Sequence, residues 1–199
     1  LVVEHKGIYS LENYLTTRRL MYWQVYLHRT CVAYEKVLVN MLMRARELIR
    51  IGQDVFASPA LYYFLSNDID AAWFGTHPEA LENYGELDDS DIWSAMKAWK
   101  HHSDKILSTL ATDMLDRKIF KVEVHEEPIT EARIAELKEK IAQKLDISID
   151  DAHYLMSVNT ISKDMYNVDD DSITILYKDG SIRDISEASE LLNVQLLSK

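Results

Sequence analysis

Glycine and proline are scarce in this chain, and their scarcity constrains the fold more than any other feature of the sequence. Only five glycines and three prolines occur in 199 residues. Because these two residue types interrupt helices and build the tight turns between strands, their scarcity favours long helices. It disfavours a β-sandwich or a β-barrel, which need a turn after each short strand. We therefore expect a mainly α-helical protein.

The spacing of apolar residues agrees with this expectation. Residues 10–51 predict one or two long helices, because leucine, valine and methionine recur at steps of three and four, and Gly52 follows as a stop signal. Residues 87–120 are also strongly helical, and Asp88 or Asp89 can cap their start. Shorter helices are predicted at 58–67 and 69–75, followed by a connector with a possible helical turn at 76–87. The buried stripe expected in the second long stretch consists of Ile92, Met96, Trp99, Ile106, Leu107 and Leu110.

The pattern changes near residue 120. We predict strands at 119–124 and 154–162, an amphipathic helix at 130–145, a hairpin at 172–186 and a final helix at 186–197. In the hairpin, Asp179–Gly180 would supply the positive φ angles of a two-residue primed turn. The sequence thus predicts a helical part over 1–122 and a small α+β lobe over 123–199.

Charge is distributed unevenly along the chain. The formal net charge is −11, which argues against general nucleic-acid binding. Residues 1–50 nevertheless hold eight Lys/Arg against four Asp/Glu, whereas the remainder holds fourteen against twenty-nine. A basic segment in an acidic protein indicates a local site for an anionic ligand.

Location is predicted from two further features. No apolar run approaches the eighteen or so residues of a membrane span, so we expect no membrane insertion. The single cysteine, Cys31, lies among apolar residues and has no internal disulfide partner. We read it as a buried thiol in a reducing cytoplasm.

The densest group of functional side chains is "TTRRLMYWQVYLHRT", residues 16–30. A continuous helix would gather six of these residues on one broad face, namely Arg18, Met21, Tyr22, Val25, Tyr26 and Arg29. Arginine binds phosphate oxygens with two parallel hydrogen bonds, and a tyrosine hydroxyl donates to phosphate or sugar. The face would suit a nucleotide phosphate. Spacing alone leaves an alternative open, in which Tyr22, Trp23 and Tyr26 are core residues and the arginines a solvated edge.

Two segments resemble HD-superfamily phosphohydrolases related to the deoxynucleoside triphosphate triphosphohydrolases. Residues 8–30, "IYSLENYLTTRRLMYWQVYLHRT", resemble the family segment in which an arginine and a methionine precede a "VY-x-H" ending. The matching positions here are Arg18, Met21, Val25, Tyr26 and His28. Residues 87–121 are similar to the family's later helix, which ends in "R-x-(L/I)-(F/Y)-K". The resemblance implies that the chain is the helical C-terminal half of such a protein, followed by the small lobe.

The resemblance also implies roles for four residues near the first motif. Arg18 would contact the nucleotide phosphates, and Tyr26 would lie near the sugar and phosphates. Tyr22 stands where some relatives have a histidine; it could donate a hydrogen bond, but tyrosine is a poor acid near neutral pH. His28 matches the motif histidine, and a packing or helix-capping role for it stays open.

Arg117 and Lys121 match basic residues of the second motif. In nucleotide-activated relatives, such residues touch a regulatory nucleotide at a subunit interface. The alternative is an ordinary basic helix end, which is favourable next to the negative terminus of the helix dipole.

The family's metal centre needs an adjacent His-Asp pair, and this chain has none among its seven histidines. The resemblance therefore implies a divalent metal ion held upstream of Leu1, with no cofactor bound by this chain and no activity of this chain alone. His101, His102 and Asp104 form the nearest thing to a ligand cluster. A solvated face is the better reading, since neighbouring helical residues point about 100° apart.

The resemblance, together with the basic and aromatic face, implies a cytoplasmic phosphohydrolase that converts a deoxynucleoside triphosphate such as dGTP to nucleoside and triphosphate. By analogy with the family we also expect a homo-oligomer. One alternative is a non-catalytic nucleotide-binding or oligomerisation module. Another reading makes the acidic lobe over 123–199 a protein-interaction surface. The phosphohydrolase requires the His-Asp metal motif upstream of Leu1 in the parent protein, whereas the absence of that motif would favour the non-catalytic module.

Overall fold

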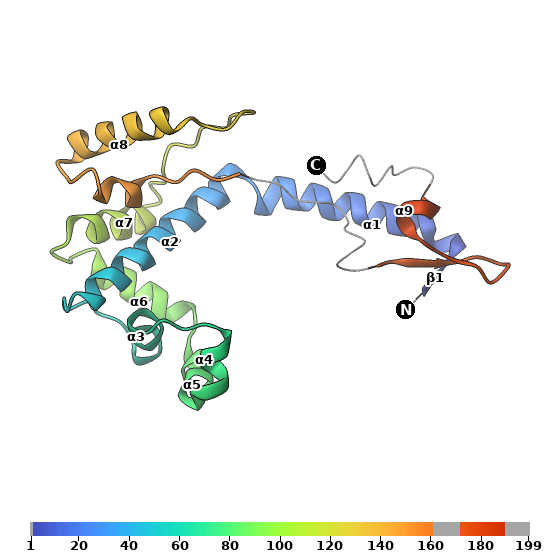
Figure 1. Cartoon of the computed structure of the whole chain (residues 1–199), viewed down its shortest axis with the longest axis horizontal. Coiled ribbons are helices and arrows are strands. Elements are labelled where there is room, and N and C mark those ends of the chain that lie inside the picture. The colour runs from blue at the N-terminus through green and yellow to red at the C-terminus, as the bar shows by residue number, and fades with distance from the viewer. Residues whose placement is uncertain (1, 161–171, 190–199) are drawn as a thin grey trace. The chain divides into compact units, whose positions relative to one another are not determined.

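The computed structural model describes residues 2–160 and 172–189, and it divides the chain into two compact units. One unit, here called the sheet unit, consists of Leu1–Val32 and Asn159–Lys199. The other, the helical unit, is Ala33–Val158. Helices predominate and the described strands form one small sheet, so the predicted mainly α fold is confirmed (Figure 1). Within these described ranges, no helix has the length and apolar character needed to cross a membrane.

The helical unit contains most of the predicted helices. Its elements are α2 (Arg29–Arg50, whose first turn belongs to the sheet unit), α3 (Pro59–Ser66), α4 (Ala71–Thr76), α5 (Pro78–Glu86), α6 (Asp89–Trp99), α7 (Lys105–Leu115), α8 (Glu131–Leu145) and the 3₁₀ helix η3 (Asp151–Leu155). Gly52 ends the α2 region at φ +81°, where glycine is favoured. The connector predicted at 76–87 is mostly the helix α5.

Polar caps set where these helices begin. Asp88 accepts from the amide of Ser90, and Asp91 accepts in return from the amide of Asp88, which forms a capping box for α6. Asp104 caps α7, so the long helix predicted at 87–120 is divided in two. Thr130 caps α8 through its hydroxyl. Each cap satisfies an amide that the first helical turn leaves without a partner.

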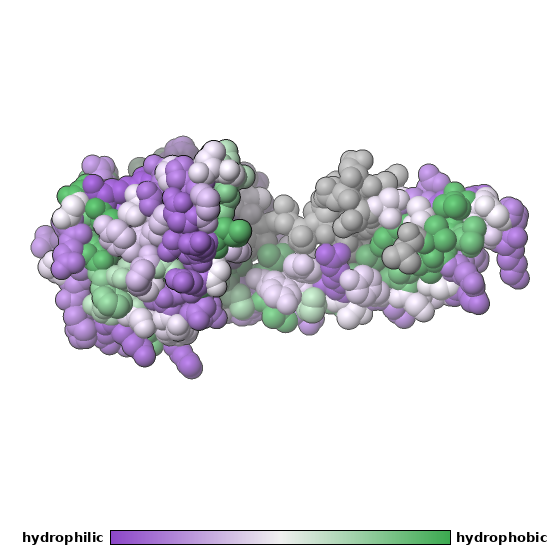
Figure 2. All heavy atoms as spheres, turned by 90° about the horizontal axis from the view of Figure 1, so that it is seen from below, coloured by the Kyte–Doolittle hydropathy of each residue, from purple (hydrophilic) through white to green (hydrophobic). Residues whose placement is uncertain are grey.

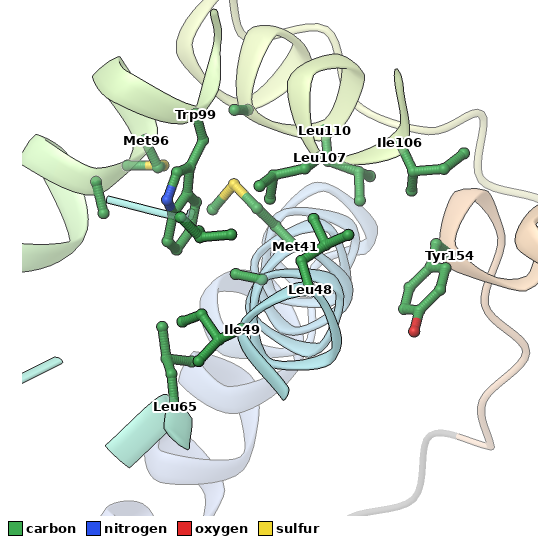
Figure 3. Packing of buried hydrophobic residues seen from close by; sticks show 14 of the residues in the cluster. Met41, Leu48, Ile49, Leu65, Met96, Trp99, Ile106, Leu107, Leu110 and Tyr154 are labelled. Atoms are coloured by element: carbon green, nitrogen blue, oxygen red, sulfur yellow. The ribbon is translucent and has the colours of Figure 1, made fainter. Parts of the chain in front are cut away.

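The core of the helical unit forms around one face of α2. Val37, Met41, Ala45 and Leu48 point inward at steps of four, four and three residues and are almost fully buried. Figure 3 shows Met41 and Leu48 among side chains of α6 and α7, including Trp99 and Leu107. The indole nitrogen of Trp99 donates to a backbone carbonyl at 2.8 Å, so its polar atom is satisfied. Five of the six residues of the predicted stripe are buried, and Ile92 packs against the cluster while half-buried.

The sheet unit is built from segments far apart in the sequence. Its described elements are β1 (Val2–Glu4), the 3₁₀ helix η1 (His5–Gly7), α1 (Ile8–Met21), the π-helical turn η2 (Tyr22–Tyr26), β2 (Thr174–Leu176), β3 (Ile182–Asp184) and the short helix α9 (Ile185–Ala188). The strand order is β1-β2-β3. β1 pairs with β2 in parallel, with Val3 opposite Ile175, and β2 pairs with β3 antiparallel. Ile8 and Leu15 of α1 bury their side chains with Ile175 and Ile185.

The hairpin is where it was predicted, but its turn differs. Gly180 has φ +84°, whereas Asp179 does not have a positive φ. The amide of Gly180 donates to the carbonyl of Tyr177, and the amide of Tyr177 donates to the carbonyl of Ser181. This is a three-residue loop that ends in a left-handed glycine, instead of a two-residue primed turn.

Four other predictions need correction or lie outside the described residues. Residues 119–124 have no strand, and residues 154–160 consist of the end of η3 and an irregular segment. The end of that predicted strand, residues 161–162, and most of the final helix, residues 190–197, lie outside the described residues. The two units also divide the chain differently from the predicted boundary at 122/123, because β1 and α1 join the hairpin and α8 joins the helices. Helical and strand spacing describe local contacts and contain no information about such distant pairings.

Cys31 is exposed, so the prediction of a buried thiol was wrong. The inward face of α2 begins at Ala33 and continues through Val37. Cys31 lies two residues before Ala33, which places it about 200° around the helix from that face.

Candidate functional site

The segment with the predicted phosphate-binding residues contains a change of helix type. α1 ends at Met21, and the amide of Leu27 donates to the carbonyl of Tyr22 at 2.7 Å, five residues earlier. This is a π-helical turn, a rare form that is found mostly as a single turn and often at functional sites. The even 100° spacing assumed for residues 18–29 therefore stops within the segment.

Arg18, Tyr22 and Tyr26 still form a row along one side of this segment. The guanidinium carbon of Arg18 lies 5.6 Å from the ring centroid of Tyr22, within cation–π range. The rings of Tyr22 and Tyr26 are 5.2 Å apart and inclined by 43°. Arg29 begins α2 after the π-helical turn. The structure thus brings three of the predicted residues together.

Most side chains of this segment reach the surface. Tyr26 is 57% exposed and Trp23 is 40% exposed, while Arg18 is exposed and Tyr22 half-buried. The alternative interpretation of Trp23 and Tyr26 as core residues is therefore wrong for this chain. Figure 2 shows that apolar residues do reach the surface among hydrophilic ones on the face in view. We call residues Arg18–His28 the candidate phosphate site, since it presents a guanidinium and aromatic groups to solvent.

His28 lies at the start of α2. Its Nδ1 accepts a hydrogen bond from the amide of Thr30 at 3.3 Å, as a capping side chain does. A ring nitrogen that accepts cannot hold the proton, so the neutral ring is protonated at Nε2, and the side chain is exposed. His28 can therefore cap α2 and still offer Nε2–H as a donor to an anion.

The two residues predicted to bind a regulatory nucleotide lie just beyond α7. Arg117 is exposed and has φ 59°, in the left-handed region that non-glycine residues rarely adopt. The ammonium group of Lys121 is 2.7 Å from a carboxylate oxygen of Glu123.

The helical unit holds a second charged group, centred on Arg44. Its guanidinium binds Asp104 through two nitrogens, at 3.2 and 2.7 Å, and its side chain is only 14% exposed. A third nitrogen is 2.7 Å from Glu47 and 3.1 Å from Asp151. The hydroxyl of Tyr154 donates to Glu47 at 2.8 Å, so the group links α2, the start of α7 and η3.

These contacts change the acidities of the group. Burial by itself would raise the pKa of Asp104, but the hydrogen bonds from Arg44 and Leu107 and the charge of Arg44 together hold that pKa below its usual value. Burial, with the hydrogen bond to Glu47 and its negative charge, raises the pKa of Tyr154 to about 12. The single guanidinium of Arg44 is shared by three carboxylates, and the arrangement joins three elements. We interpret it as a structural group, which sequence spacing could not find because Arg44 and Asp104 are sixty residues apart.

The weak cluster of His101, His102 and Asp104 also has a structural explanation. Nδ1 of His102 accepts from the amide of Asp104 at 3.0 Å, and Nε2 lies 3.1 Å from the carbonyl of Asp54. Among the described residues, no group of three or more His, Cys, Asp or Glu side chains is placed to hold a metal ion. An open hollow of about 450 Å³ lies beside the end of α8, lined by Glu139, Asp146 and four uncharged residues. Carboxylates at its rim make it unsuited to phosphate.

Comparisons with known proteins place this geometry in context. No family model matches the chain. The uncharacterized protein YwfO of Bacillus subtilis is 27% identical over 198 residues, which cover 96% of this chain and 43% of that protein. The crystal structure of a phosphohydrolase from Bacteroides thetaiotaomicron matches with a TM-score of 0.89 and 57% identity, over all of this chain and 49% of that one. The chain therefore shares its fold with part of that phosphohydrolase and spans about half the length of either relative.

Proposed function

We propose that this chain forms part of a phosphohydrolase whose substrate is a deoxynucleoside triphosphate such as dGTP. The observation that carries the proposal is the 57% identity, along the whole chain, to a protein named a phosphohydrolase. The row of Arg18, Tyr22 and Tyr26 is consistent with it, because a guanidinium flanked by phenol groups suits a polyphosphate. The products would be the nucleoside and triphosphate.

The proposal assigns the metal to a part of the protein outside this chain. A divalent ion there would activate water and polarise the phosphate under attack. Arg18 would stabilise the charge that develops on the phosphate oxygens, and the hydroxyl groups of Tyr22 and Tyr26 would orient the substrate. By the same proposal the protein is cytoplasmic, and Arg117 and Lys121 contact a regulatory nucleotide.

The test compares variants of the longer protein, assayed with dGTP and a divalent metal by separating nucleoside from triphosphate. Arg18→Ala should lower kcat/KM by about 10²-fold or more, since it removes one preorganised charge-stabilising donor. Lys6→Ala is the matched control, because Lys6 is a cation of the same unit that is 84% exposed and paired with Glu4 at the opposite end of α1. An unchanged kcat/KM in Arg18→Ala would rule out the assigned role.

A second pair of variants separates the two possible roles of His28. His28→Asn retains a capping side chain but loses the Nε2–H donor, whereas His28→Ala loses both. If His28 binds substrate, both variants lose activity. Activity that survives in His28→Asn would assign the residue to capping alone.

The alternative, a non-catalytic nucleotide-binding or oligomerisation module, predicts a different outcome for the same protein. It would bind dGTP, with weaker binding in Arg18→Ala, but would release no triphosphate with any divalent metal. Calorimetric binding measured beside the turnover assay distinguishes the two functions.

A further inference from the structure

The segment Ile119–His125 joins α7 to α8 and has neither helix nor strand (Figure 1). Its sequence, "IFKVEVH", alternates apolar and polar residues as a strand does. Within the described part of the chain, no backbone amide or carbonyl of this segment makes a hydrogen bond. Such groups are ordinarily paired with protein or water, and an unpaired extended backbone is a template for another strand.

The side chains of the segment divide into two faces. Phe120 packs against the core of the helical unit, Val122 is half-buried, and Val124 is 81% exposed. On the other face, Lys121 and Glu123 contact each other at 2.7 Å. Residues two apart share a side only in an extended chain, so the backbone here already has the alternation of a strand.

We propose that Ile119–His125 is an intermolecular edge strand, which pairs antiparallel with the same segment of a second copy about a two-fold axis at Val122. In this register Lys121 of one copy lies opposite Glu123 of the other, and the symmetry repeats the contact. Lys118 and Glu126 lie opposite each other in the same way at the ends. The segment is therefore complementary in charge to itself, as a two-fold interface requires.

Neighbouring registers lack this complementarity. A shift of two residues in one direction places Lys121 opposite Lys121, and a shift in the other places Glu123 opposite Glu123. A shift of one residue would set Phe120 opposite Glu123 and mix the apolar and charged faces. Parallel pairing in register would align every charge with its like. Like charges directly opposite each other are destabilising, so the sequence specifies one register.

The proposed pairing also accounts for the exposure of Val124. In this register Val124 lies opposite Phe120 of the second copy, beside the edge of that copy's core. Val122 would meet Val122 at the axis. The most exposed apolar side chain in the segment would then be covered by an apolar neighbour.

The inference does not depend on the proposed hydrolase function and is tested without nucleotide or metal. Sedimentation of the 199-residue chain at increasing concentration should show a monomer–dimer equilibrium. Lys121→Glu and Glu123→Lys each place like charges opposite one another twice, and each should weaken dimerisation by about tenfold or more. Mixing the two variants restores opposite charges at both contacts, so a mixed dimer should form where neither variant dimerises alone.

Mixed dimers can be detected by energy transfer between dyes attached at Cys31, the exposed single cysteine. Lys144→Glu changes the net charge equally at an exposed position of α8 and should leave dimerisation unchanged. A chain that stays monomeric at every concentration would overturn the proposal. A dimer that tolerates both reversals, or variants that fail to rescue each other, would overturn it equally.

Discussion

Asp104 shows how one side chain can serve two elements. It caps α7 and also binds the guanidinium of Arg44 on α2 with two hydrogen bonds. Because both partners stabilise the ionised carboxylate, the pKa of Asp104 is lowered in the folded state. A group with a lowered pKa stabilises the fold above its unfolded pKa, and that contribution disappears as the pH falls through the folded pKa.

We expect Asp104→Asn to lower the free energy of unfolding by about 1–3 kcal/mol at pH 7, since the charged hydrogen bonds to Arg44 are lost. The cap remains, because asparagine caps helices as well as aspartate does. The difference from the unsubstituted chain should shrink as the pH falls from about 4, the unfolded pKa, through the lower folded pKa, because the carboxylate is protonated in both states only below the folded pKa. Urea denaturation at a series of pH values measures it.

Asp113 provides a control of opposite sign. Burial raises its pKa, so its ionisation destabilises the folded state, and stability is lost as the pH rises through the unfolded pKa. Asp113→Asn should therefore be more stable than the unsubstituted chain at neutral pH. This difference should be smaller at acid pH, where Asp113 is protonated. The interpretation of Asp104 fails if both variants show the same dependence on pH.

At the scale of elements, two helices end in a residue other than glycine with a left-handed backbone. Arg117 follows α7 at φ 59°, and Asp146 follows α8 at φ 51°. Glycine is the usual residue at this position, because a Cβ atom is disfavoured there. Aspartate tolerates the left-handed region better than arginine does.

Arg117→Gly should therefore raise the free energy of unfolding by about 0.5–1 kcal/mol, and Asp146→Gly by about half as much. Lys138→Gly, inside α8, is the control and should lower it by about 1 kcal/mol. Chemical denaturation of the three variants at one pH provides the comparison. A loss of stability in Arg117→Gly would mean that the arginine side chain makes a stabilising contact that outweighs the backbone strain.

The elements also show how much local spacing could predict. The amphipathic helices and the cap at Asp88 follow from the sequence, because period and capping chemistry are local. The π-helical turn at Tyr22–Tyr26 does not, since one added residue per turn leaves no distinct signature in apolar spacing. The row of Arg18, Tyr22 and Tyr26 was therefore predicted, whereas the change of helix type before Arg29 was not.

At the scale of the whole molecule, the two units differ in continuity. The helical unit is one stretch, Ala33–Val158, whereas the sheet unit needs both ends of the chain. Ile8 and Leu15 near the N-terminus bury their side chains in one cluster with Ile175 and Ile185. Domain boundaries drawn from a change of pattern assume that each domain is continuous.

We predict that a fragment of residues 33–158 folds on its own, while a fragment of residues 1–122 does not. The first retains the core around α2, including Tyr154 and Leu155 of η3. The fragment of residues 1–122 lacks Tyr154 and Leu155, which help to cover that core. It also lacks β2, which pairs with β1, and β3, which pairs with β2. Cooperative unfolding and dispersed amide resonances would identify a folded fragment. Cooperative folding of 1–122, with disorder in 33–158, would restore the boundary at 122/123.

By itself, the sequence determined the helical class, the main helices with their caps, and the concentration of basic and aromatic side chains near residue 20. These depend on periodicity and on contacts within a few residues. Tertiary structure alone decided that Val3 pairs with Ile175, that Arg44 binds Asp104, and that Cys31 faces outward. Such contacts join residues distant in the chain or depend on which face of a helix meets a neighbour, and both follow from how the whole chain buries its apolar surface.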